Sequence, residues 1–269
     1  MTGETLPPPP DVAESVGLDR LTADLRSLGL RPGQDLLVHC SLSAIGWVDG
    51  GPATLLQAIQ EVAGPGATIV VFAQTPLTSR TSEAFRSETA GLSRPEIERF
   101  AAEHAAFDPQ TSPSYNVGRF AEHVRTSPGA CRSAHPQASF AALGRAAAAI
   151  TSGHEPECHL GERSPLRWLY DHDAAILLIG VDYDVCTAFH LAEYRVGGGA
   201  DIRGSDLDDD DFQQIGEALD RYLLDHPGSD DPVSRHVGRA PSRLVPLRTA
   251  VNFAVSWMEK NRTGTPHDK

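Results

Sequence analysis

The chain has 269 residues, 40% of them hydrophobic, and its 23 Lys and Arg against 36 Asp and Glu give a net charge of −13 at pH 7. This length and apolar content suffice for a substantial buried core, whereas the negative charge disfavours nucleic acid because it repels phosphate backbones. No run of eighteen apolar residues occurs and the start, MTGETLPPPP, lacks the apolar core of a secretory signal, so we expect no membrane span and a cytoplasmic location.

The composition also indicates one folded domain between two unstructured ends. Four prolines near the start cannot form a helix, so residues 1–10 are predicted to be a disordered leader. No internal repeat or shift in composition divides the remainder. We therefore expect a single domain over residues 11–262 and a frayed tail at 263–269.

Residues 18–73 predict a helix followed by a strand–helix–strand unit. Leucines at helical spacing predict the first helix over 18–28, ending at Gly29. Short apolar runs at 35–40 and 67–73 are typical of buried strands, and the segment between them has a helical pattern. Such a crossover joins parallel strands, so the sequence predicts an α/β fold with a mostly parallel central sheet flanked by helices.

Residues 74–113 form a long polar excursion, which in a compact domain is typical of a functional loop or lid. Helices are predicted within it at 95–107 and after it at 116–129 and 145–153. A third apolar run at 174–181 then predicts another buried strand.

The stretch TAFHLAEY, residues 187–194, follows this strand and has the pattern of a helix. Ligands in open α/β sheets bind beyond the carboxyl ends of strands, where this helix begins. His190 and Glu193 lie three residues apart, so the carboxylate can orient the imidazole and support its charge when it acts as a general base. A surface His beside a Glu is also common without any function, and spacing alone leaves both interpretations open.

Two further helices are predicted near the C-terminus. An acidic run opens the segment 204–228, where it both caps the N-terminus of a helix and solvates a loop. The last helix is predicted at 246–261.

Two loops combine residue types that can bind ligands. Residues 39–51, HCSLSAIGWVDGG, follow a predicted strand, and their small hydroxyl side chains and glycines let an extended ligand approach the backbone. They lack the glycine patterns of dinucleotide- and triphosphate-binding loops. Residues 132–139, RSAHPQAS, include an Arg, the side chain best suited to phosphate. An ordinary connection explains the first pattern about equally well, and an ordinary loop explains the second better.

Together, three stretches of the chain resemble the aminoglycoside 3-N-acetyltransferases, also called antibiotic N-acetyltransferases. They are LGLRPGQDLLVHCSLSAIGWVDGG, FDPQTSPSYNVGRFAEHVRTSPGACRSAHPQASFAALG and SPLRWLYDHDAAILLIGVDYDVCTAFHLAEYR, with a weaker match near RLVPLRTAV. The resemblance implies the family's own three-layer α/β fold, distinct from the GNAT acetyltransferase fold. It implies transfer of acetyl from acetyl-CoA, without a metal, to the 3-amino group of the 2-deoxystreptamine ring of cationic antibiotics, which confers resistance.

The resemblance also assigns individual residues. His190 and Glu193 match the family's HxxE catalytic pair. Positions that face the pantetheine arm of CoA are matched by Ser41, Leu42, Ser43 and Val48. The segment near CoA is matched by Arg132, Ser133 and Ser139. His39 and His135 match motif positions to which we assign no individual role.

The chemistry of acetyl transfer agrees with this assignment. An alkyl amine with a pKa near ~10.4 is almost wholly protonated at pH 7, so the reaction needs a proton acceptor, and His190 can serve as one. We expect direct transfer in a complex of both substrates, with Thr187 or a backbone N–H as donor to the developing oxyanion. The candidate contacts of the cationic acceptor are Asp108, Asp184 and Glu103, and a solvated surface acid is the alternative for each.

The sequence is also compatible with other functions. Cys186 stands where many relatives have Asn and Cys40 where they often have Ser, so the acceptor could be another amine. A metal-dependent hydrolase would use His39, Cys40, Cys131 and His135, although this spacing is weak support. A cysteine acyl-enzyme would use Cys186 near His190. A CoA-binding protein without activity is a further alternative, and the sequence allows a monomer or a homodimer.

Overall fold

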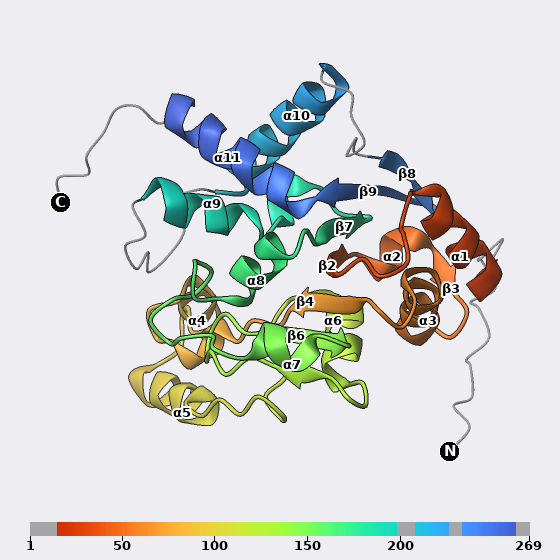
Figure 1. Cartoon of the computed structure of the whole chain (residues 1–269). Helices are drawn as coiled ribbons and strands as arrows, with labels where there is room; N and C mark the ends of the chain where they lie inside the picture. Colours follow the sequence, from red (N-terminus) through yellow and green to blue (C-terminus); the bar gives the residue numbers. More distant parts are fainter. Residues whose placement is uncertain (1–14, 198–207, 226–232, 262–269) are drawn as a thin grey trace.

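The computed structural model describes residues 15–197, 208–225 and 233–261 (Figure 1). The predicted leader and tail lie outside these residues. The strands are β1 (Ser15–Val16), β2 (Leu36–Cys40), β3 (Trp47–Val48), β4 (Thr68–Phe72), β5 (Cys131–Arg132), β6 (Phe140–Gly144), β7 (Ala175–Ile179), β8 (Val233–Val237) and β9 (Ala240–Pro246).

The helices include every helix that the sequence predicts. They are α1 (Leu18–Ser27), α2 (Leu42–Ile45), α3 (Pro52–Ala63), α4 (Glu83–Glu88), α5 (Arg94–His104), α6 (Gly118–Thr126), α7 (Ala147–Thr151), α8 (Pro165–Asp171), α9 (Phe189–Val196), α10 (Asp209–Asp225) and α11 (Leu247–Asn261). Short 3-10 turns occur at Pro76–Thr78 and Tyr183–Val185. Among the described helices, none has both the length and the apolar character that crossing a membrane requires.

The described residues form a central sheet of seven strands in the order β5-β6-β4-β2-β7-β9-β8, and β1 pairs separately with β3. The strands at the centre, β4, β2 and β7, run parallel, as the predicted crossover requires. The outer pairings are antiparallel: β4 pairs with β6 and β6 with β5 on one side, and β7 pairs with β9 and β9 with β8 on the other. The α/β class is confirmed, whereas the expectation of a mostly parallel sheet is right only for its centre.

The antiparallel strands at the edges of the sheet have weak signals in their own sequences. β5 has only two residues, and β9 contains Pro241 and Pro246, which weaken a strand pattern because proline donates no hydrogen bond. β8 has the mixed sequence VSRHV rather than a continuous apolar run. These strands are therefore specified by pairing with their neighbours more than by their own composition.

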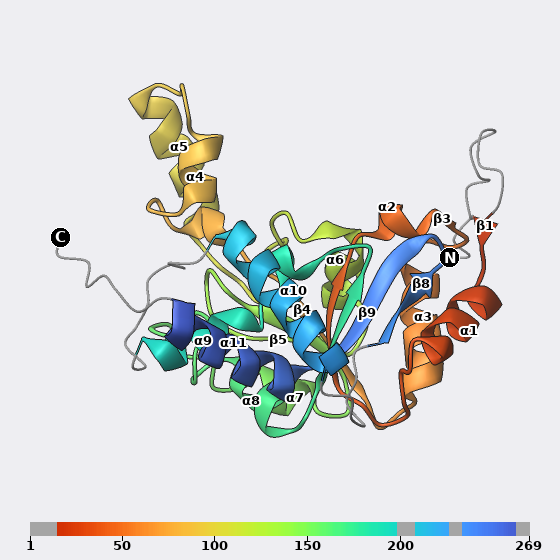
Figure 2. The same ribbon diagram turned by 90° about the horizontal axis from the view of Figure 1, so that it is seen from above.

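Helices cover both faces of the sheet (Figure 2). α1, α3 and α6 pack on one face, and Figure 2 shows α9 and α11 on the other side of the strands. The side chains of β2 alternate between these layers: Leu36 and Val38 contact the first core and Leu37 contacts the second. Burying a leucine side chain contributes roughly 1.5–3 kcal/mol, so two such cores stabilise the central strands from both faces.

Local signals set the ends of several helices. α1 is followed by Gly29 with a φ of 97°, a left-handed conformation that glycine adopts without strain. α5 begins with a capping box, in which Ser93 bonds the first turn and the Glu96 carboxylate accepts from the Ser93 N–H at 2.7 Å. Both signals are visible in the sequence, which explains why these boundaries agree with the prediction.

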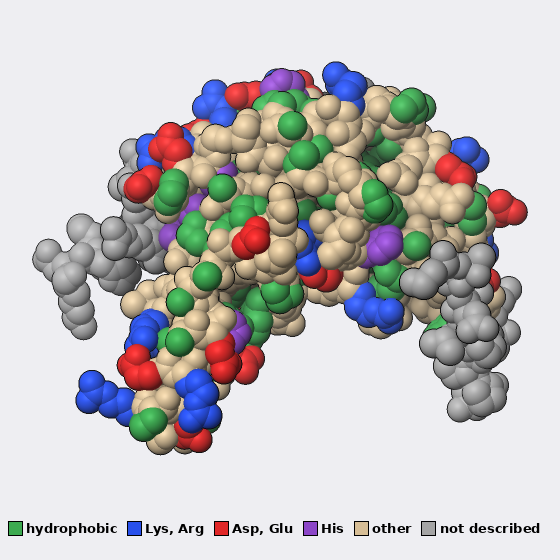
Figure 3. Space-filling model, turned by 90° about the horizontal axis from the view of Figure 1, so that it is seen from below, with side chains coloured by type: hydrophobic (Ala, Val, Ile, Leu, Met, Phe, Trp, Pro, Cys, Tyr) green, Lys and Arg blue, Asp and Glu red, His purple; other side chains and the backbone are tan. Residues whose placement is uncertain are grey.

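Helices α4 and α5 lie in the polar excursion and project from the body as an arm (Figure 2). The arm is held together by an edge contact between the rings of Phe85 and Phe100, 5.4 Å apart, and by an ion pair between Arg80 and Glu98. In Figure 3 the arm carries both basic and acidic side chains. The predicted lid or functional loop is thus a helical arm, and α4 at its base reaches the cleft described below.

Candidate active site

A cleft of about 1480 Å³ opens beyond the carboxyl ends of the parallel strands. The end of β2 contributes residues 38–41, β4 contributes Phe72, and the segment after β7 contributes Val181 and Asp184. The first residues of α6 and α10, the start of α9 and part of α4 also contribute to the lining. The site therefore lies where an open α/β sheet is expected to bind its ligands.

The start of α6 packs against the end of β2. Gly118, the first residue of α6, has a φ of 82°, and a Cβ added there would lie 3.4 Å from the carbonyl oxygen of Cys40, an ordinary contact distance. The left-handed backbone conformation at Gly118 is therefore what favours glycine, because other residues are strained there. The wall of the cleft between β2 and α6 thus depends on a glycine.

The predicted pair of His190 and Glu193 is formed at the edge of this cleft. His190 lies in the first turn of α9, and its Nδ1 is 2.6 Å from Oε2 of Glu193. The glutamate side chain is 4% exposed, whereas the imidazole is 24% exposed and lines the cleft. The edge contact with the Phe212 ring, at 4.8 Å between centroids, further fixes the orientation of the imidazole. This geometry leaves Nε2 of His190 as the nitrogen that can take a proton.

A second imidazole, that of His39, lines the same cleft. His39 is paired in register with Leu178 of β7, and Leu178 belongs to the core beneath α9, so the His39 side chain lies on the α9 face of the sheet. Burial and the proximity of His190 lower the pKa of His39 to about 4, which keeps the ring neutral at pH 7. Its Nε2 is enclosed by protein and has no hydrogen-bond partner in the described part of the chain.

Acidic side chains give the cleft a negative wall. Asp184 lies in the turn before α9, and its Oδ1 is enclosed without a hydrogen-bond partner in the described ranges. The start of α10 adds Asp208, Asp209 and Asp210. From the sequence this acidic run is predicted only to cap a helix and solvate a loop, because nothing local shows that α10 brings its first turn beside α9. α4 adds Glu83 and the cation Arg86, so the lining carries both signs of charge.

Two of the three acids predicted to bind the acceptor lie outside this lining. Asp108 accepts hydrogen bonds from the Gln110 N–H at 2.8 Å and the Thr111 hydroxyl at 2.9 Å, and these bonds hold its pKa below the usual range. Its carboxylate therefore stabilises its own turn. Glu103 is exposed on α5. Among the three, the structure brings only Asp184 into the cleft with His190.

The residues predicted to face pantetheine differ in position. Ser41 lines the cleft, and its backbone N–H donates to the carbonyl of Ile179 at 2.9 Å. Its hydroxyl lies 3.2 Å from that of Ser43, which with Leu42 begins the short helix α2. Val48 is 6% exposed and packs in the core beneath α1 and α3, away from the cleft lining. Contact with pantetheine stays a prediction for all four, and Ser41 has the most direct access.

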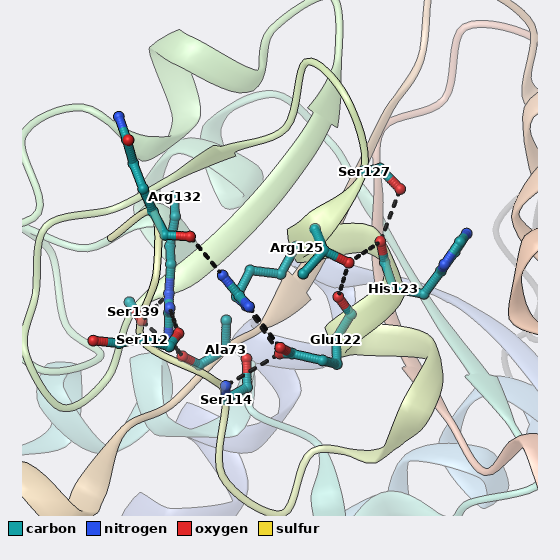
Figure 4. Close-up of polar contacts among 11 residues, drawn as sticks. Ala73, Ser112, Ser114, Glu122, His123, Arg125, Ser127, Arg132 and Ser139 are labelled. Carbon is teal, nitrogen blue, oxygen red and sulfur yellow. Dashed lines mark hydrogen bonds and ion pairs between the residues drawn. The ribbon is translucent and has the colours of Figure 1, made fainter. Parts of the chain in front are cut away.

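The guanidinium of Arg132 is hydrogen-bonded to other groups of the protein (Figure 4). It donates to the Ser139 hydroxyl at 3.0 Å and to the backbone oxygens of Ala73 and Ser112. Burial lowers its pKa to about 10. The predicted role near CoA stays a prediction, and the observed contacts connect β5, β6 and the end of β4.

Ser133 and Ser139 are also buried and bonded within the protein. Ser133 bonds Nδ1 of His154 at 2.9 Å and accepts from the Phe140 N–H, and Ser139 donates to the carbonyl of Ala73 at 2.7 Å. Thr187, in contrast, lines the cleft, and its carbonyl accepts from the His190 N–H at 3.2 Å. Its predicted role as an oxyanion donor is compatible with this position.

The structure gives little support to the two alternative chemistries. In the described residues, no three His, Cys, Asp or Glu side chains are grouped so as to hold a metal ion. Cys131 of β5 and Cys40 of β2 are separated by two intervening strands, roughly 14 Å at the usual strand spacing. Cys186 is fully buried outside the cleft lining, and burial raises the pKa of its thiol to about 12, which disfavours the nucleophilic thiolate.

Comparison with known families decides the classification. A family model described as aminoglycoside 3-N-acetyltransferase matches residues 37–204, more than half of the chain. The chain belongs to the aminoglycoside 3-N-acetyltransferase family. The predicted family is thus confirmed, and with it membership of a family of acyltransferases.

Relatives of the aminoglycoside 3-N-acetyltransferase family match nearly the whole chain. The SPbeta prophage-derived aminoglycoside N(3')-acetyltransferase-like protein YokD of Bacillus subtilis (strain 168) is 34% identical over 262 residues, which cover 90% of this chain and 92% of YokD. Aminoglycoside N(3)-acetyltransferase VII of Streptomyces paromomycinus is 32% identical over 274 residues, which cover 90% and 91% of the two chains.

Solved structures confirm that the fold is that of this family. The crystal structure of YokD matches with a TM-score of 0.81 and 30% identity, over 95% of this chain and 97% of the other. AAC-IIIb in a binary complex with CoASH matches with a TM-score of 0.74 and 29% identity, over 94% and 99%. AAC-VIa bound to sisomicin matches with a TM-score of 0.73 and 29% identity, over 93% and 100%.

Proposed function

We propose that this protein transfers the acetyl group of acetyl-CoA to the 3-amino group of the 2-deoxystreptamine ring of an aminoglycoside, and thereby confers resistance. The supporting observation is the bond of 2.6 Å between His190 and Glu193 at the edge of an open cleft. Membership of the family gives the reaction class, and a relative named for its complex with CoASH supports acetyl-CoA as the donor.

In the proposed mechanism, His190 acts as the general base in a complex of both substrates. Nε2 of His190 takes the proton of the attacking amine, while the carboxylate of Glu193 on Nδ1 stabilises the imidazolium that results. The amine and the thioester are held in one cleft, so transfer is direct. No acyl-enzyme on Cys186 is needed, in keeping with its burial.

The acceptor is held by the acidic side of the cleft. Asp184 and the acidic start of α10 attract the ammonium groups of a polycation, and Oδ1 of Asp184, which has no hydrogen-bond partner among the described residues, gains one when an ammonium binds. Predicted contacts with Asp108 and Glu103 would require an acceptor that extends beyond the cleft. We further propose a single domain over residues 11–262, a cytoplasmic location and a monomeric or homodimeric state.

The experiment is mass spectrometry of a panel of aminoglycosides after incubation with acetyl-CoA and the protein. We expect addition of one acetyl group to members with a free 3-amino group, and none to matched members in which that amine is blocked. His190→Ala should lower the rate by about a hundred- to ten-thousand-fold, since general-base assistance is of this size. His172→Ala, at an exposed position that is not part of the cleft lining, is the matched control. Acetylation of no panel member, or equal rates for wild type and His190→Ala, would contradict the proposal.

A further inference from the structure

The hydrogen bonding of His39 differs from that of two other histidines buried in this chain. Both ring nitrogens of His135 bond backbone groups, and both ring nitrogens of His154 bond protein atoms. In the described ranges, Nε2 of His39 is enclosed but unpaired. An unpaired buried polar atom costs about 1–3 kcal/mol, and such atoms often mark a group that acts on a ligand.

The position of His39 places this imidazole beside the reacting centre. It lies at the carboxyl end of β2, on the face of the sheet that α9 covers, and it lines the same cleft as His190. The two rings are close enough for the charge of His190 to lower the pKa of His39. An amine that is bonded to His190 must lie next to the thioester that it attacks. That thioester is therefore also close to His39.

We propose that His39 is a catalytic residue that donates a hydrogen bond to the acyl oxygen of the thioester as this oxygen becomes negative. The assignment rests on the proposed acetyl transfer. Since no described residue bonds Nε2, the ring loses no hydrogen bond there when it turns about its Cβ–Cγ bond toward the substrate. His135 and His154 would lose several such bonds in the same rotation.

The two imidazoles have different roles in the reaction: His39 stabilises the oxyanion and His190 accepts the proton. The amine nitrogen attacks the carbonyl carbon, the π pair moves to the oxygen, and an N–H of neutral His39 stabilises the oxyanion while keeping its proton. The ammonium proton passes to Nε2 of His190. The C=O bond then re-forms, the C–S bond breaks with its electron pair on sulfur, and the thiolate of CoA is protonated by His190 or solvent.

Steady-state kinetics of His39→Leu and His39→Gln test this role. The leucine removes the donor and should lower kcat by about 10²–10³-fold, the usual effect of losing one oxyanion donor, with KM for acetyl-CoA changed less than about threefold. The glutamine keeps an N–H donor near the position of Nε2 and should recover at least about tenfold of that loss. Equal kcat for wild type and His39→Leu, or equal losses for both variants, would overturn the proposal.

A second measurement is independent of the acceptor. The protein labelled with ¹⁵N-histidine is titrated with a ketone analogue of acetyl-CoA in which a methylene replaces the thioester sulfur. We expect the His39 N–H resonance, identified by its absence from His39→Gln, to move downfield on binding. An unchanged His39 resonance with bound analogue overturns the role of His39, whereas failure of wild-type protein to acetylate any panel member counts against the proposed function itself.

Discussion

The single residue Glu193 contributes to the site through its negative charge as well as through its hydrogen bond. Its side chain is 4% exposed and lies 2.6 Å from Nδ1 of His190, so it stabilises the imidazolium in surroundings where water screens little. Glu193→Gln keeps an oxygen that accepts from Nδ1–H but removes the charge. We predict a fall in kcat of about ten- to a hundredfold with little change in KM, measured by release of CoA.

A double variant separates this role from a merely structural one. If Glu193 acts through His190, Glu193→Gln should cause no further loss of kcat in a His190→Ala background, because the group it supports is already gone. Multiplying losses in the double variant would show that Glu193 acts independently of His190.

At the scale of elements, α10 contributes charge to the cleft that its own sequence does not reveal. Asp208, Asp209 and Asp210 are exposed at its start and line the cleft. Exposed ion pairs are each worth about 0.2–1 kcal/mol. Converting all three to Asn should raise KM for a polycationic acceptor by about three- to 150-fold and weaken its dependence on salt, with kcat nearly unchanged.

The matched control for this triple variant is Asp19→Asn, an exposed acid in the first turn of α1. Both changes remove a favourable interaction with a helix N-terminus, so thermal melting measures that shared cost. An equal KM for the acceptor in wild type and the triple variant would show that the start of α10 does not contact the substrate.

The sequence predicts what is local and leaves out what tertiary structure brings together. The strands β2, β4 and β7 are predominantly apolar runs, and the pair of His190 and Glu193 follows from helical spacing. The edge strands depend on their neighbours for pairing, so their own sequences are weak signals. The approach of α10 to α9 depends on contacts between distant segments, and so does the lack of a partner for Nε2 of His39 within the part of the chain that the structure describes. Arg132 is the opposite case. Its residue type is suited to phosphate, but its guanidinium donates hydrogen bonds to backbone carbonyls of the protein.

At the scale of the whole molecule, buried histidines make the fold sensitive to acid. Burial lowers the pKa of His39 and His154 to about 4 and that of His135 to about 3. Below the unfolded value of about 6.5, the unfolded chain binds protons that the folded chain excludes. Stability is therefore fully present above pH 6.5 and should fall by about 1.4 kcal/mol per group for each pH unit below it, until the folded pKa is reached.

Urea unfolding at pH 7 and pH 5 measures this loss. The midpoint for wild type should fall strongly at pH 5, and His135→Gln should show a smaller difference between the two pH values because it removes one of the three groups. His172→Gln, at an exposed position, is the control. A wild-type midpoint that is the same at both pH values would contradict the account of these histidines.

The most direct test of the central claim is chemical rescue of His190→Ala with imidazole. If the ring of His190 takes the proton of the amine, free imidazole that enters the cleft should restore acetyl transfer at least about tenfold, in proportion to the concentration of its neutral form. Glu193→Gln, which retains the ring, should not respond. Full turnover by His190→Ala without imidazole, or no response to imidazole at any concentration despite intact folding, would contradict the claim that His190 is the general base.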